Sequence, residues 1–198
     1  MATPTHRRFI TTTKRVVFFD LETTTGSDQR VIEFGAAEID VNTLAVKQTL
    51  RMDIGGPEVA ALVTAWSQSI NHISADRCSK AVPFAAAAAR IAKFMDGAVW
   101  CGHNIRAFDI PKLRSEFDRA RLSSMFPTCL GMLDTLDEYR RMRRSGAMPV
   151  EIENLKLATV AKHTGLGTET HTALEDAVMA WEALCRIADM VPTEAFSF

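Results

Sequence analysis

The sequence predicts a single α/β domain in which the strands come first, as a meander, and then alternate with helices. The run VVFFD at residues 16–20 is apolar on both alternating faces, which fits a central strand covered on both sides. Two segments rich in strand-forming residues, 30–41 and 44–54, are separated by the dipeptide NT and predict a hairpin. Beyond Pro83, short apolar runs alternate with segments of helical periodicity.

Glycine and proline mark the boundaries of the predicted elements in the middle of the chain. The stretch 55–57 (Gly-Gly-Pro) interrupts the strand pattern. PFAAAAARIAKFM, which starts at Pro83, predicts a helix with proline in its first turn, and Gly97 ends it. The apolar run AVWCG at 98–102 then fits another buried strand.

The second half alternates helices with one more strand. A helix is expected around residues 106–121, and Pro111 either marks its start or distorts it. LGMLDTL at 130–136 predicts a strand that leads into a helix, and NLKLATVAKHTGLG predicts a helix closed by Gly165. The last helix is expected over 173–190. Four apolar residues at helical spacing should pack this helix on the core: Leu174, Val178, Trp181 and Leu184.

The composition is that of an ordinary globular protein. The chain has 198 residues, enough for one domain with a substantial core. With 23 basic and 24 acidic residues it is not a basic protein that coats nucleic acid, although a nucleic-acid enzyme with local basic groups is compatible with this balance. The cysteines are scattered without a CxxC pair, so neither a zinc site nor a disulfide framework is expected: they are Cys78, Cys101, Cys129 and Cys185.

We expect three parts along the chain: a flexible N-terminal segment at 1–14, one domain at 15–192, and a C-terminal tail at 193–198. The unpaired cysteines predict an intracellular protein of the cytoplasm or nucleus. The first residues are basic, rich in threonine and free of acids, so targeting to an organelle stays open. No apolar run reaches membrane-spanning length, and no membrane partner is expected.

The first motif is Asp20-x-Glu22, directly after the buried run. Positions two apart on an extended chain point to the same side, so both carboxylates could face one metal ion. Acidic residues are common where a strand ends at the surface. Taken alone, this pair fits such a polar strand end better than it fits a metal site.

The second motif is HNIRAFD, residues 103–109, which follows the predicted strand AVWCG. His103 and Asn104 at a strand-to-helix junction could simply cap the helix. Asp109 lies between Phe108 and Ile110, and a carboxylate among large apolar residues is costly to bury without a partner such as a cation. An aspartate exposed to water at a helix terminus remains an equal alternative.

The third motif is HTALEDA, residues 171–177. Thr172 and Glu175 have the spacing of a capping box, which predicts that the helix begins near Ala173. His171 then lies just outside the helix and Asp176 in its first turn. On one continuous helix the two side chains would point about 140° apart, whereas with the histidine outside the helix they can converge. A lone exposed histidine is usually a surface residue without a function. A functional role for His171 is favoured only because an acid, Asp176, follows it at this spacing.

Together, and in this order, D-x-E, HNxxxFD and H-x-A-L-x-D-A resemble the DEDDh 3′–5′ exonucleases of the ribonuclease H-like superfamily, from Val16 to about Ala188. FFDLETT, GHNIRAFDIPKLRSEF and LATVAKHTGLGTETHTALEDA are most similar to the plant NEN-type exonucleases. The resemblance implies a ribonuclease H-like fold, a central mixed five-stranded sheet flanked by helices on both faces. The turn DLETTTG has one threonine more than the common DxETTG, and the role of that threonine stays open.

The resemblance implies a metal-dependent 3′–5′ exonuclease that hydrolyses phosphodiester bonds of DNA or RNA and releases nucleoside 5′-monophosphates. It implies two Mg²⁺ or Mn²⁺ ions in the active site, held by four carboxylates: Asp20, Glu22, Asp109 and Asp176. Four crowded carboxylates could not all stay ionised without cations. His171 would be the general base that takes a proton from the attacking water.

The residues that hold the substrate are harder to identify from the sequence. A single strand needs charge contacts along its backbone and stacking surfaces for its bases. The candidate substrate contacts are Leu21, Thr23, His103, Asn104 and Arg106, with Lys112 and Arg114 as further candidates near the second motif. The basic run RRMRR at 140–144 could contact phosphates, but a solvated helix end fits it at least as well.

The expected partner is the 3′ end of a single-stranded nucleic acid, and a homodimer stays open because several relatives are dimers. DNA or RNA, and single or double strand, are not decided by the sequence. A module on the same fold that binds 3′ ends without cutting is the alternative function. The presence of all four acids and His171 favours the enzyme.

Overall fold

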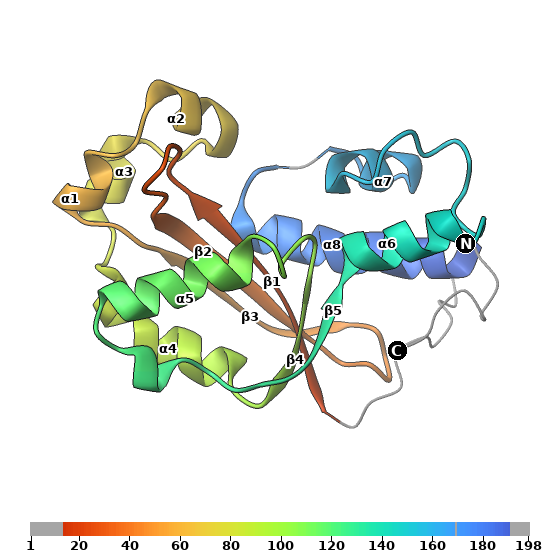
Figure 1. Cartoon of the computed structure of the whole chain (residues 1–198), viewed down its shortest axis with the longest axis horizontal. Coiled ribbons are helices and arrows are strands. Elements are labelled where there is room, and N and C mark those ends of the chain that lie inside the picture. Colours follow the sequence, from red (N-terminus) through yellow and green to blue (C-terminus); the bar gives the residue numbers. More distant parts are fainter. Residues whose placement is uncertain (1–13, 169, 191–198) are drawn as a thin grey trace.

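The computed structural model describes residues 14–168 and 170–190 (Figure 1). Nearly all of the predicted N-terminal segment and the whole predicted tail lie outside the described residues. The first described strand begins at Arg15. No described helix is long and apolar enough to cross a membrane.

Five strands form one mixed sheet in the order β3-β2-β1-β4-β5. Its first three strands form the predicted antiparallel meander: β1 (Arg15–Thr23), β2 (Val31–Ile39) and β3 (Val46–Asp53). The other two lie parallel on the opposite side of β1, where they are β4 (Ala98–Gly102) and β5 (Cys129–Asp134). The mixed five-stranded sheet implied by the resemblance is therefore confirmed, and β1 lies at its centre.

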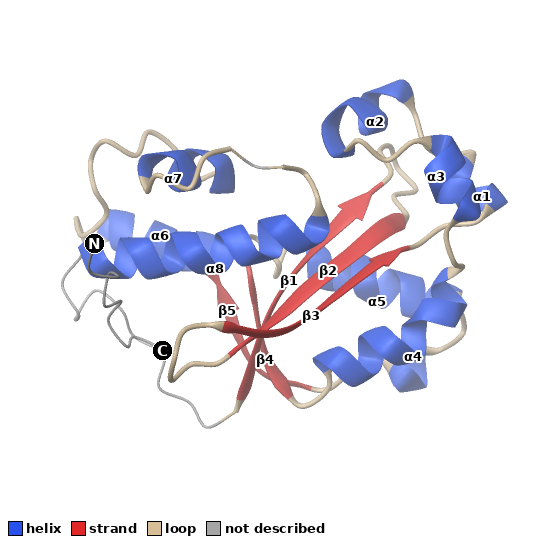
Figure 2. Cartoon of the chain, turned by 180° about the vertical axis from the view of Figure 1, so that it is seen from behind, coloured by secondary structure: helices blue, strands red, loops and turns tan. Residues whose placement is uncertain are grey.

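Helices cover both faces of the sheet (Figure 2). Because neighbouring side chains of a strand point to opposite faces, β1 contributes to two cores. Val17 and Phe19 pack with α4 (Phe84–Met95) and α5 (Asp109–Arg119). On the other face, Val16 and Phe18 belong to the core formed by three helices: α6 (Thr135–Arg144), α7 (Leu157–His163) and α8 (Ala173–Met190).

Three short helices between β3 and α4 were not predicted from the sequence. They are α1 (Pro57–Ala60), α2 (Ala65–Asn71) and α3 (Ala75–Lys80), and a single 3₁₀ turn, η1 (Ser123–Met125), precedes β5. Each has at most seven residues, fewer than the window of about 11–18 residues in which helical periodicity can be recognised, so no hydrophobic pattern marks it. The helices α1 and α3 pack in a small separate cluster with Ile32 of β2.

The longer helices begin close to their predicted positions. Pro83 is the N-cap of α4 rather than a residue of its first turn. The helix α5 begins at Asp109, so Pro111 lies in its first turn, where a missing N–H costs no hydrogen bond. The predicted apolar stripe of α8 does pack on the core. Trp181 and Leu184 are buried, whereas Leu174 and Val178 are partly buried and small residues between them complete the buried face.

Candidate active site

The site lies at the carboxyl end of β1, where a buried strand emerges with two acids. Asp20 and Glu22 are both half-buried, and they follow a run of four fully buried residues. By strand alternation they share the face of Val16 and Phe18, which is the face that α8 covers. Both predicted acids of the first motif are therefore directed toward the helix that carries Asp176.

Close contact between α8 and the sheet depends on Gly35. This residue of β2 pairs with Asp20 across the antiparallel ladder. A Cβ atom placed on Gly35 would lie 2.0 Å from the backbone nitrogen of Leu174. The first turn of α8 therefore rests on bare backbone directly beside Asp20, at a distance that a side chain would prevent.

The third motif converges on the first. One ligand atom each from Glu22, His171 and Asp176 lies within 4.8 Å of the other two. Asp176 is 6% exposed and accepts a hydrogen bond from the N–H of Thr170 at 3.3 Å. His171 has a positive φ of 53°, a backbone conformation that turns the chain just before α8 begins at Ala173. His171 thus lies outside the helix, with a ring nitrogen within 4.8 Å of a carboxylate oxygen of Asp176.

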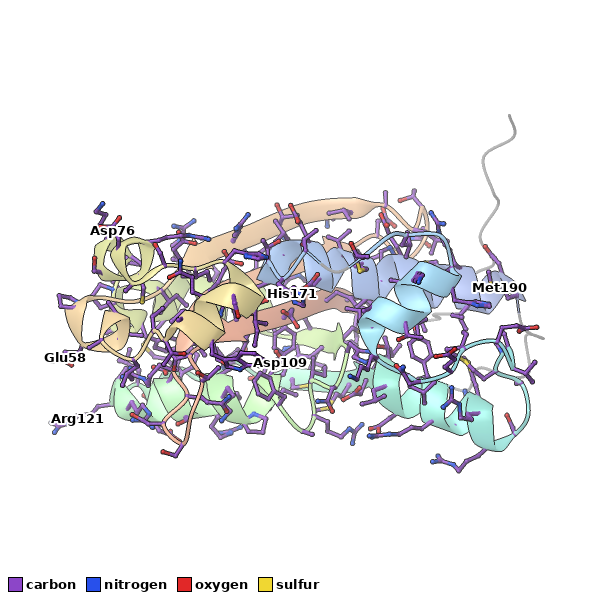
Figure 3. The ribbon with its side chains drawn as sticks, turned by 90° about the horizontal axis from the view of Figure 1, so that it is seen from above. Glu58, Asp76, Asp109, Arg121, His171 and Met190 are labelled. Carbon is purple, nitrogen blue, oxygen red and sulfur yellow. The ribbon has the colours of Figure 1, made fainter. Side chains whose placement is uncertain are left out.

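Asp109 reaches the same strand end from α5 (Figure 3). It is 2% exposed, and its Oδ1 accepts a hydrogen bond from the backbone N–H of Leu21 at 3.0 Å. Burial raises the pKa of the Asp109 carboxyl, and the nearby charge of Asp134 raises it further, against the lowering effect of backbone hydrogen bonds. Among the described residues, Asp20 and Asp109 are not members of the close group formed by Glu22, His171 and Asp176.

Asp134 organises the second motif, a role the sequence did not reveal. It ends β5, is 4% exposed, and accepts hydrogen bonds from the backbone N–H groups of Asn104 at 2.8 Å and Arg106 at 3.0 Å. The same carboxylate caps α6 through the N–H of Leu136. The sequence placed Asp134 where a strand leads into a helix, and this position does not predict the two long-range bonds.

His103 is held beside α6 and is largely enclosed. Its Nδ1 lies 2.9 Å from the hydroxyl of Thr135. Burial lowers the pKa of His103 to about 4, so its ring is neutral at pH 7. As a substrate contact it can therefore offer a hydrogen bond but no positive charge to a phosphate.

The other predicted substrate contacts differ in their exposure. Asn104 is half-buried and has a positive φ of 63°, whereas Arg106 is exposed, with its Nε 3.5 Å from a carboxylate oxygen of Asp137. Leu21 is 4% exposed. Thr23 is half-buried at the end of β1.

The threonine-rich turn after Glu22 is held from within. Thr24 is fully buried; its N–H donates to the carbonyl of Arg30 at 2.9 Å, and its hydroxyl accepts the N–H of Arg30 at 2.9 Å. A register shift between Glu22 and Thr23 marks the point where the turn departs from the ladder.

The helix α2 braces the same turn from outside. The side-chain amide of Asn71 donates to the carbonyl of Thr23 at 3.2 Å, and the hydroxyls of Thr25 and Thr64 lie 3.1 Å apart. Of the three threonines, Thr23 and Thr25 therefore contact α2 or its N-cap residue, whereas Thr24 closes the turn on Arg30.

A ribonuclease H-like sheet with acids at the end of its central strand, at the start of α5 and at the start of α8 defines a nuclease of the DEDDh class. The chain belongs to the exonuclease family described by the RNase_T model, which matches residues 17–184. This is a family of hydrolytic nucleases.

Curated relatives agree with this assignment. The chain is 32% identical over 175 residues to protein NEN2 of Arabidopsis thaliana, an alignment that covers 85% of this chain and 34% of NEN2. It is 29% identical to protein NEN4 of the same plant, covering 91% of this chain and 69% of NEN4. The predicted similarity to NEN-type proteins is confirmed, and the chain spans only about a third of the length of NEN2.

Solved structures share the fold at low sequence identity. Exonuclease I of E. coli, in a complex with single-stranded DNA, superposes with a TM-score of 0.74 at 20% identity, covering 89% of this chain and 40% of that one. The nuclease domain of 3′hExo, a DEDDh protein bound to rAMP, superposes with a TM-score of 0.70 at 16% identity, covering 95% of this chain and 94% of that one.

Proposed function

We propose that this protein is a divalent-metal-dependent 3′–5′ exonuclease that releases nucleoside 5′-monophosphates from the 3′ end of a nucleic acid. The observation that carries the proposal is the meeting of Glu22, His171 and Asp176 within 4.8 Å of one another. These residues come from two segments far apart in the sequence, the end of β1 and the start of α8. The family assignment supports the same reaction type.

The chemistry of the donor set fits a hard divalent cation. Four carboxylates are available at the strand end: Asp20, Glu22, Asp109 and Asp176. Oxygen ligands suit Mg²⁺ or Mn²⁺, and no thiol takes part. Burial disfavours the ionised form of Asp109, and a nearby cation would favour that form again. Two such ions, when bound, would offset the negative charge that develops on the phosphate oxygens during cleavage.

In this proposal His171 is the general base. An imidazole changes its charge between pH 5 and 8, which suits proton removal from water near neutrality. His171 precedes α8 on a turn with positive φ, so it can move with the turn while Asp176 stays fixed in the helix.

The proposed substrate is a single-stranded 3′ end. Support comes from solved structures with the same fold: a complex with single-stranded DNA, a nuclease domain bound to rAMP, and a 3′-exonuclease that recognises the 3′ end of a histone mRNA stem-loop. These ligands belong to those proteins and include both DNA and RNA. The direct measurement is an incubation with 5′-labelled DNA and RNA, single and double stranded, in Mg²⁺ and in Mn²⁺, followed by analysis of the product ladders.

The decisive variant is Asp20→Ala. We expect it to abolish the release of mononucleotides while leaving the melting temperature close to that of the wild type, because Asp20 is half-buried at a strand end. Full activity of Asp20→Ala would refute the proposal. Binding of a 3′ end in Mn²⁺ by the wild type without any release of mononucleotide would instead support the alternative of a non-cutting module.

A further inference from the structure

A second feature lies next to the second motif: an open cleft of about 610 Å³ between the loop after β4, α6 and the segment before α7. His103 and Asn104 form one end of it. Its other walls include Arg140 and Arg143 of α6, together with Leu155 and Lys156.

The cleft is positively charged. Arg140, Arg143 and Lys156 are all exposed, and none of the described residues that line the cleft is acidic. Arg143 donates to a neutral group, the carbonyl of Ile152, at 2.5 Å, so its charge is not offset there. Arg140 is 3.1 Å from Asp137, but both side chains are about half exposed, and such surface pairs hold their partners weakly.

The floor of the cleft is apolar. Leu136 and Leu155 are half-buried and Leu157 is buried, so the cleft offers hydrocarbon surface between its cations. A single nucleic-acid strand fits such a surface, because its phosphates bind cations and its bases pack on apolar side chains. A purely ionic ligand would gain nothing from the leucines.

The position of the cleft connects it to the active site. His103 and Asn104 are the start of the segment that ends at Asp109, and Asp134 fixes the backbone of Asn104 and Arg106. A strand whose 3′-terminal nucleotide lies by Asp109 can therefore pass Asn104 and enter the cleft. His103 is neutral at pH 7, so the phosphate charge has to be met by Arg140, Arg143 and Lys156.

We propose that this cleft binds the phosphates of the nucleotides that lie 5′ of the one being removed, with Arg140, Arg143 and Lys156 as the cations. The proposal rests on the proposed exonuclease function and extends it to the grip on the substrate strand. It also separates the members of the basic run at 140–144, because Arg141 is engaged by Glu138 of its own helix at 2.7 Å and does not line the cleft.

The chain offers a matched control at the opposite end of the sheet. A second basic cleft of about 430 Å³ is lined by Arg15, Arg90 and Lys93. Arg15 is the first residue of β1, whereas the active site is at the other end of that strand. Removal of two positive charges from this second cleft shows how net charge alone affects binding of the substrate, because these residues lie away from its proposed path.

The test compares Arg143→Ala/Lys156→Ala with Arg90→Ala/Lys93→Ala on two substrates. One is the p-nitrophenyl ester of thymidine 5′-monophosphate, in which p-nitrophenol replaces the preceding nucleotide, so the molecule is too short to reach the cleft. The other is a 5′-labelled single strand of about ten nucleotides, as DNA and as RNA, enough to fill a groove of this kind. KM and kcat are measured over a range of salt concentrations.

We expect the cleft variant to raise KM for the oligonucleotide about tenfold and to reduce the salt slope of binding by about 1.4, or 0.7 for each lost phosphate contact. Hydrolysis of the ester should stay within about twofold of the wild type, and the control variant should match the wild type on both substrates. The single variant Lys156→Glu, at an exposed position, should raise KM for the oligonucleotide further without affecting folding.

Two results would overturn the inference. One is an unchanged oligonucleotide KM and salt slope in the cleft variant and in Lys156→Glu. The other is an equal change in the control variant, which would mean that only net charge matters. If wild-type protein cleaves neither the ester nor the oligonucleotide, the proposed exonuclease function itself fails, and this outcome is distinct from a failure of the cleft alone.

Discussion

The backbone N–H of Leu21 donates a hydrogen bond to Oδ1 of Asp109 at 3.0 Å, across 88 residues of sequence. The peptide that makes this bond lies between Asp20 and Glu22, so the start of α5 is fixed to the point of β1 that carries both acids. Because a backbone group is the donor, a side-chain substitution at position 21 would leave the bond in place. Asp109 is therefore positioned by the main chain of the central strand.

This relationship makes Asp109→Asn an informative change. The asparagine carbonyl can still accept from Leu21, so the fold should persist, but the carboxylate is lost. Activity should fall at least about 100-fold, comparable to the loss of other groups that stabilise charge in a transition state. Nucleotide release and thermal unfolding, both measured on the same preparations, check the two expectations.

The same variant predicts a pH dependence of stability without metal. Because burial raises the pKa of Asp109 above its ordinary 3.8, the folded chain holds this proton at a pH where the unfolded chain has released it. Stability from this group is thus lost as the pH rises above about 4. In EDTA, Asp109→Asn should therefore melt higher than the wild type at pH 7.5 and show a smaller difference at pH 4.5. A difference that is the same at both pH values would contradict this account of Asp109.

His171 calls for a substitution that respects its backbone. Alanine is strained at a φ of 53°, whereas asparagine tolerates this region, so His171→Asn removes the imidazole and keeps the turn. If His171 is a general base, kcat should fall by about 10²–10⁴-fold while the affinity for Mn²⁺, measured by calorimetry, changes little. A parallel loss of Mn²⁺ affinity would make His171 a metal ligand, a role that its distance from Glu22 and Asp176 also permits.

Local signals made part of this site predictable. The buried run before Asp20 and the two-residue spacing to Glu22 follow from strand geometry, and the Thr172–Glu175 spacing correctly placed the start of α8 at Ala173. Each of these inferences uses residues within a few positions of one another. Sequence patterns report short-range structure of this kind because backbone periodicity is local.

Long-range bonds were not predictable. Glu33 lies in a strand whose nine residues are all buried, so no alternation marks it, and its partners Arg51, Arg77 and Ala173 lie 18, 44 and 140 residues away. The same holds for Asp134, because two of its backbone donors, Asn104 and Arg106, become its neighbours only when β4 and β5 pair. The hydrogen-bond partners of such buried carboxylates can be identified only from the three-dimensional structure.

Glu33 should act as a positioning residue for the active site. Its fully buried carboxylate accepts from Arg51 at 2.8 Å, from Arg77 at 2.6 Å and from the N–H of Ala173 at 2.7 Å. This last bond ties the start of α8, and with it His171 and Asp176, to β2. We expect Glu33→Gln to cost about 1–3 kcal/mol of stability and to lower kcat about tenfold with little change in KM.

Glu38→Gln is the matched control for that prediction. Glu38 is 3% exposed on the same strand and is paired with Arg15 and Lys47, far from the catalytic end. It should lose a similar amount of stability but keep kcat at temperatures where both variants are folded. Faster hydrogen exchange at the Ala173 amide in Glu33→Gln alone would mark the loosened helix start. Equal kcat losses in the two variants would reduce Glu33 to a purely structural role.

Gly35→Ala tests whether the close approach of α8 to the sheet is required. The added Cβ would lie 2.0 Å from the nitrogen of Leu174, and because the clash is with backbone, no rotation of a side chain can relieve it. Overpacking of this kind costs about 3 kcal/mol or more, which corresponds to a fall in melting temperature of roughly 6–12 °C for a chain of this size. Gly131→Ala on β5 is the control, since its Cβ would meet Val99 at an ordinary 3.6 Å. That variant should keep its melting temperature and its activity. The folded fraction of Gly35→Ala, in contrast, should cleave slowly, because the displaced α8 moves Asp176 away from Glu22. Equal melting temperatures for the two variants would mean that α8 does not rest on Gly35.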